Sequence, residues 1–154
     1  MPGFDVLENL FVGAAFAFHA VLLAHFTARR WRFETAIRYG RVVYALAIPF
    51  AILSLIQLAV GNPWWLWLGG FLYAAWAVFG HLVEYVLRIE WRSPVRWAIF
   101  VPYVLLYLAT SMLYWWPLAR LSGPLWFMAA ALFGVSTWLN VRSHHPDPNA
   151  TPAR

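Results

Sequence analysis

The stretch WWLWLGGFLYAAWAVFGHLV, residues 64–83, decides the fold. It contains no Asp, Glu, Lys or Arg over 20 residues, and a membrane-spanning helix needs about 20 mostly apolar residues. Four more stretches lack these residue types over 19, 19, 23 and 21 residues, at positions 10–28, 42–60, 97–119 and 121–141. The sequence therefore predicts an all-α, polytopic integral membrane protein with five transmembrane helices.

The overall composition supports the same class. Only 11% of the 154 residues are charged and 63% are hydrophobic, whereas a soluble domain carries about 25% charged residues. So few charges cannot cover a water-facing surface, which excludes a soluble domain and a disordered chain. The net charge of +5 comes from arginines beside the apolar stretches, where they act as topology signals. We therefore expect membrane lipids, and no nucleic acid, around the protein.

We expect one domain, residues 1–142, followed by a disordered cytoplasmic tail, residues 143–154. Asp5 and Glu8 have the spacing of a capping box at the first helix, and Pro49 should kink the second span. The five helices of the bundle are predicted at about 5–28, 41–60, 64–87, 95–119 and 123–141.

The arginines orient the predicted bundle. Ten of the eleven fall on one side of the five spans, and only Arg120 falls on the other. By the positive-inside rule the N-terminus lies outside and the C-terminus in the cytoplasm, which predicts a multi-pass protein of the cell inner (plasma) membrane. Trp31, Trp91 and Trp97 fit an aromatic belt at the inner boundary.

Small and polar residues in the spans predict helix contacts. Gly13, Ala17 and Ala20 begin a stripe of small residues on the first span, which favours close packing against another helix. Ser54 and Gln57 on the second span are candidates for hydrogen bonds between helices.

The third span carries the main candidate site. At 100° per residue, Gly70, Ala77, His81, Glu84 and Arg88 lie along one stripe. Ionisable groups in a span mark functional sites, so His81 and Glu84 are the candidate catalytic pair for proton transfer. The alternative is structural: Arg88, four residues after Glu84, is placed to form an ion pair with it.

Other polar groups are expected at the same depth, toward the cytoplasmic leaflet. His19 and His25 lie in the inner half of the first span, about 120° apart on the helix, and Tyr103 lies near the inner side of the fourth. The candidate ligand-binding residues are His19, His25, Trp76, Arg88, Tyr103, Tyr107 and Asn140.

These groups predict that this small, tryptophan-rich membrane protein binds a lipophilic molecule near the cytoplasmic leaflet. Chemical conversion of the bound molecule is the second part of the prediction. The alternatives are a tetrapyrrole-binding subunit, with haem held by histidines, and a structural subunit that associates with a membrane-protein partner or with copies of itself. No metal site is expected, and the sequence leaves open whether the protein is an enzyme.

The chain also resembles a known family in its architecture. Its length, five spans, many tryptophans and basic tail are similar to the tryptophan-rich sensory (translocator) proteins, which bind porphyrins and sterols in a five-helix bundle. The segments Phe100-Val101-Pro102-Tyr103 and Trp138-Leu139-Asn140 resemble the last two helices of that family. After the first helix the family has a loop with Lys-Pro and Pro-Pro, where this chain reads Arg-Trp-Arg-Phe-Glu. No site residues are carried over from the resemblance.

Overall fold

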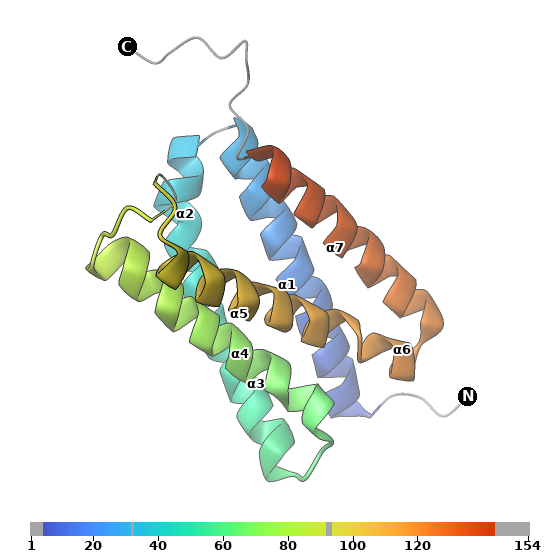
Figure 1. Ribbon diagram of the computed structural model, residues 1–154. Coiled ribbons are helices and arrows are strands. Elements are labelled where there is room, and N and C mark those ends of the chain that lie inside the picture. The colour runs from blue at the N-terminus through green and yellow to red at the C-terminus, as the bar shows by residue number, and fades with distance from the viewer. Residues whose placement is uncertain (1–4, 32, 92–93, 144–154) are drawn as a thin grey trace.

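The computed structural model describes residues 5–31, 33–91 and 94–143, and this part of the chain is helical without strands (Figure 1). Five helical stretches are long and apolar enough to cross a membrane, as the uncharged stretches predict. Most of the predicted tail 143–154 lies outside the described residues. The elements are α1 (Val6–Trp31), α2 (Phe33–Ala45), α3 (Ala47–Ala59), α4 (Trp64–His81), η1 (Leu82–Val86), α5 (Trp97–Trp115), α6 (Leu118–Leu121) and α7 (Gly123–Ser143).

Two local sequence features, the capping box of the first span and the proline of the second, have the structural effects that they predict. The Glu8 amide donates to Asp5 Oδ1 at 2.6 Å, and the Asp5 amide donates to Glu8 Oε2 at 3.1 Å, which confirms the capping box. The second span breaks into α2 and α3 at Leu46. The break lies three residues before Pro49, whose ring excludes the carbonyl of Ala45 and which has no amide hydrogen to donate to it.

The basic segment between the first two spans is expected to be a loop, but its described residues are helical. Helix α1 continues to Trp31, and α2 begins at Phe33. Arginine favours helices, and Arg29 and Arg30 in the last turn of α1 complement the negative end of the helix dipole. The two spans are therefore longer at this end than their apolar stretches.

The spans pack mainly on their sequence neighbours. Helix α4 packs between α3 and α5, α1 packs against α2, and α7 returns to pack along α1. Helices α5 and α7 have much less contact with each other than α7 has with α1, and they diverge from the corner at α6 (Figure 1). Near that corner, Trp115 stacks on Trp126 and Phe133 at centroid distances of 5.3 and 5.7 Å.

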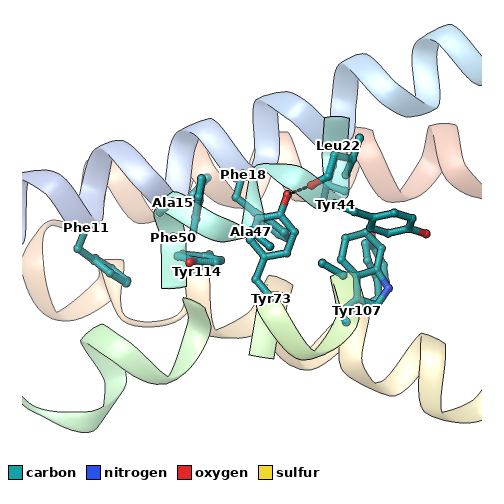
Figure 2. Packing of buried hydrophobic residues seen from close by; sticks show 14 of the residues in the cluster. Phe11, Ala15, Phe18, Leu22, Tyr44, Ala47, Phe50, Tyr73, Tyr107 and Tyr114 are labelled. Carbon is teal, nitrogen blue, oxygen red and sulfur yellow. Dashed lines mark hydrogen bonds between the residues drawn. The ribbon is translucent and has the colours of Figure 1, made fainter. Parts of the chain in front are cut away.

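Aromatic rings fill the middle of the bundle (Figure 2). Phe18 on α1 lies 5.0 Å from the ring centroids of both Tyr73 and Tyr114, and Phe50 on α3 lies 5.2 Å from Tyr73. The Tyr73 hydroxyl donates to the carbonyl of Val43 at 2.5 Å. A polar tip with a backbone partner lets the large ring be buried without loss of hydrogen bonding.

Small residues allow close helix approach on α4 but not on the predicted stripe of α1. A Cβ at Gly70 would lie 2.6 Å from the carbonyl oxygen of Phe50 on α3, so glycine is required where the two backbones meet. At Gly13 no atom lies within 4 Å of the position that a Cβ would take, and Ala17 and Ala20 are not buried. The prediction of a packing face there was wrong, because α1 turns its aromatic stripe toward the bundle instead.

Gln57 links the ends of two spans, as expected of a polar residue in this position. Its amide nitrogen donates to the carbonyl of Leu7 at 2.9 Å, and its amide oxygen accepts a hydrogen bond from the side chain of Asn62. Gln57→Leu should lower the free energy of unfolding in mild detergent by about 1 kcal/mol. The control Thr110→Val removes a hydroxyl that bonds only within its own helix, to Leu106 at 2.7 Å. An equal loss in both variants would contradict the role of Gln57 between helices.

Candidate functional site

A cavity of about 560 Å³ lies between all five spans. It occupies the end of the bundle where α1 ends and α2 begins, away from the α3–α4 turn (Figure 1). Its volume is in the range of about 300–1,000 Å³ that is typical of small-molecule sites. The lining residues are Leu22, His25, Phe26 and Arg29 of α1, Gly40, Val43 and Tyr44 of α2, Trp76, Glu84, Tyr85 and Trp91 from α4 to the loop, Phe100, Tyr103, Val104, Tyr107 and Leu108 of α5, and Thr137, Asn140 and Val141 of α7.

A carboxylate and two phenols form one polar group in this cavity. The Tyr44 hydroxyl donates to Glu84 Oε2 at 2.9 Å and lies 3.3 Å from the Tyr103 hydroxyl. Three separate elements, α2, η1 and α5, are thereby joined. The Tyr44 ring fits because Gly80 has no side chain: a Cβ there would lie 2.6 Å from the Tyr44 hydroxyl and 2.7 Å from Cζ.

The turn Leu82–Val86 is a π-helix, and it sets which side chains of this span reach the cavity. The amide of Leu87 donates to the carbonyl of Leu82 at 2.8 Å, five residues back, so the turn is wider than the α-helical turn of about 3.6 residues. The angle between His81 and Glu84 therefore differs from that in the predicted α-helix. Glu84 lines the cavity, whereas His81 is exposed and stacks on Tyr85 at 5.5 Å.

Aromatic rings form most of the cavity wall. Trp76 packs against Tyr44, Tyr103 and Tyr107 at centroid distances of 5.5, 5.6 and 5.8 Å. Trp91, in the loop between η1 and α5, covers Tyr103 at 4.9 Å and is only 3% exposed. The rings offer a large apolar surface with few polar tips, which is the usual character of a site for a lipophilic ligand.

Some buried polar atoms of the lining residues have no hydrogen-bond partner among the described residues. They include Trp76 Nε1, the Tyr107 hydroxyl and the Thr137 hydroxyl. Buried polar groups are nearly always hydrogen-bonded, and each orphaned group costs about 1–3 kcal/mol. All three belong to residues that line one cavity, whereas both ring nitrogens of His19, which also have no partner among the described residues, lie outside it.

The structure brings six of the nine predicted site residues to the cavity: His25, Trp76, Glu84, Tyr103, Tyr107 and Asn140. The other three are elsewhere. His19 is fully buried beside Phe18 and Phe133, His81 is exposed, and Arg88 has a φ of 51° just after the π-helix and does not line the cavity. The catalytic pairing of His81 with Glu84 stays a prediction, since only Glu84 lines the cavity.

Sequence reasoning missed several lining residues, of which Tyr44 and Trp91 are the most important. The reason for choosing Tyr103, a phenol in the inner half of a span, also applies to Tyr44, so the signal was present. Trp91 was assigned to an aromatic belt, and this prediction was wrong because the loop folds back over Tyr103. No local sequence pattern predicts that the loop folds back in this way. Trp31 and Trp97, in contrast, are exposed.

No metal centre is found in the described part of the chain: no three His, Cys, Asp or Glu side chains there gather into a group that could hold an ion. The histidines of the two candidate spans are also separated, because only His25 lines the cavity. No protein-family model, no curated protein and no solved structure matches the chain. The likeness to the tryptophan-rich sensory proteins is therefore one of length, span number and composition.

Proposed function

We propose that this membrane protein binds a lipophilic small molecule in the cavity between its five spans. The observation that carries the proposal is the cavity of about 560 Å³ with aromatic walls and three polar atoms that no described residue satisfies. An apolar cavity with a few placed polar groups is the usual form of a small-molecule site. Conversion of the ligand, with Glu84 as the acid–base group, is part of the same proposal.

The orientation proposed for the bundle places the cavity near the cytoplasmic leaflet. Arg29 lines the cavity, and Arg30 and Arg41 lie on the helices that end or begin beside it. Arginine is enriched on the cytoplasmic side of membrane proteins, so this end of the bundle faces the cytoplasm. In a bacterial cell the membrane concerned would be the inner (plasma) membrane.

The first experiment identifies what the protein carries. The protein is purified in mild detergent, and extracts are analysed by mass spectrometry and by a visible spectrum. We expect a lipophilic compound at a constant ratio to protein, and a colourless one. Visible absorption with the bands of a tetrapyrrole would replace this proposal by haem binding through His25. The absence of any compound above the detergent and lipid background would count against a bound ligand.

Replacing the carboxylate tests the polar centre of the site. Glu84→Gln keeps one oxygen that can accept from the Tyr44 hydroxyl and replaces the other by an uncharged amide group of nearly the same size, so the fold should remain. We expect the amount of co-purified compound to fall about tenfold or more, with little change in the melting temperature. The matched control is Glu90→Gln, at an exposed carboxylate in the loop. A lower melting temperature with the compound retained would show that Glu84 has a structural role only.

A further inference from the structure

The polar atoms of the cavity indicate the chemistry of its ligand. We propose that the ligand presents a hydrogen-bond-accepting oxygen, a carbonyl or hydroxyl oxygen on an apolar body, to Trp76, Tyr107 and Thr137. This inference rests on the proposed function and adds to it a chemical class. It is carried by Trp76 and Tyr107, which are 4% and 6% exposed, together with the half-buried Thr137.

The hydrogen-bonding capacity of these three groups requires an acceptor atom on the ligand. The indole Nε1 of Trp76 can only donate, whereas the two hydroxyls can donate or accept. An oxygen with lone pairs therefore satisfies Trp76 and either hydroxyl, but a ligand group that only donates leaves the indole N–H orphaned. An ammonium head group is thus excluded as the group that meets Trp76.

The three residues line the same cavity from three helices. Trp76 and Tyr107 are in ring contact at 5.8 Å. The Tyr107 hydroxyl of α5 is near the hydroxyls of Thr137 on α7 and of Ser111 on its own helix, without meeting hydrogen-bond geometry to either. The cavity wall therefore offers polar groups from α4, α5 and α7 to a ligand oxygen.

Hydration of the cavity does not remove the need for a ligand oxygen. A water molecule can satisfy such groups before the ligand enters. A purely apolar ligand would displace that water and leave the three groups unpaired, and displacing ordered water without replacing its hydrogen bonds lowers affinity. A ligand that supplies an oxygen at this position avoids the loss.

The test uses two rigid tricyclic probes of nearly equal shape, fluorenone and fluorene, which differ by one carbonyl oxygen. Binding to the full-length protein in nanodiscs is measured by titration, corrected for partition into empty nanodiscs. We expect fluorenone to bind about five-fold more tightly than fluorene, as one hydrogen bond in a desolvated site provides. Equal affinity for the two probes would overturn the proposal and leave the proposed function intact. Binding of neither probe would overturn both.

Two double variants, each lacking two hydroxyl groups, test whether the preference for fluorenone arises at the cavity wall. The double variant Tyr107→Phe/Thr137→Val should reduce the preference for fluorenone about two-fold or more. The control Tyr114→Phe/Thr110→Val removes two hydroxyls of the same kinds at buried positions of α5 that do not line the cavity, and should keep the preference. The same response in both double variants would overturn the assignment.

A direct readout follows the indole itself. The eleven tryptophans are labelled with ¹⁵N at the indole nitrogen, and Trp76→Phe identifies the signal of Trp76 by its loss. Fluorenone should move the Trp76 indole proton downfield, as a new hydrogen bond does, and fluorene should not. A Trp76 signal that responds equally to both probes would overturn the hydrogen bond to the carbonyl.

Discussion

Gly70→Ala is expected to lower the free energy of unfolding by about 3 kcal/mol, at the upper end of what overpacking a core costs. The added Cβ would lie 2.6 Å from the carbonyl oxygen and 3.1 Å from the carbonyl carbon of Phe50. These atoms belong to the α3 backbone and cannot rotate away, so the two helices must separate. The helices also hold the ring contact of Phe50 with Tyr73 at 5.2 Å, which the separation would loosen.

The matched control for Gly70 is Gly134→Ala on α7, where no atom lies within 4 Å of the added Cβ. Its stability should change by less than about 0.5 kcal/mol, or rise slightly, because alanine favours a helix over glycine. Both variants are compared by reversible unfolding in mixed detergent micelles. If Gly70→Ala unfolds like the wild type, the backbones of α3 and α4 do not meet closely at Gly70.

Val104→Trp is expected to abolish probe binding while the fold is retained. Val104 lies on the cavity-lining face of α5, and an indole there occupies the space that the ligand needs. The affinity for fluorenone should fall about tenfold or more, equivalent to about 1.4 kcal/mol or more of binding free energy. The melting temperature should stay near that of the wild type, since the side chain fills existing space and need not displace its neighbours.

The control for this variant is Val101→Trp, which adds the same side chain to an exposed position of α5 that does not line the cavity. It should bind fluorenone like the wild type. Undiminished binding to Val104→Trp would place the probe outside the cavity and would contradict the proposed function. A loss in both variants would point to a general effect of the added indole on α5.

The number of spans and several local features follow from the sequence because each depends on local chemistry, whereas the first two spans extend beyond their predicted limits. Long stretches without charge define the spans, Asp5 and Glu8 cap the first one, and Pro49 breaks the second. The angle of about 120° between His19 and His25 also predicts that they face different surroundings. The structure separates them accordingly, with His19 in the core and His25 at the cavity.

The remainder of the site depends on contacts between segments that are distant in the chain. The rotation of Glu84 away from His81 arises in the π-helix, which no residue pattern in the span indicates. Tyr44 reaches Glu84 across forty positions, and its place depends on the absence of a side chain at Gly80. Helical periodicity describes the faces of a single helix and contains no information on these partners.

The π-helix makes this site sensitive to the insertion or deletion of single residues in the third span. A turn that closes over five residues instead of four is equivalent to a one-residue insertion in a regular helix. Deleting one residue within Leu82–Val86 would restore α-helical geometry there and leave the side chains after the turn facing nearly as before, because five steps of a π-helix rotate the chain about as far as four steps of an α-helix. The side chains within the turn change direction, however, so a chain shortened ahead of Glu84 no longer holds this carboxylate where Tyr44 meets it. The number of residues between Gly80 and Trp91 is therefore as much a determinant of the cavity as their identity.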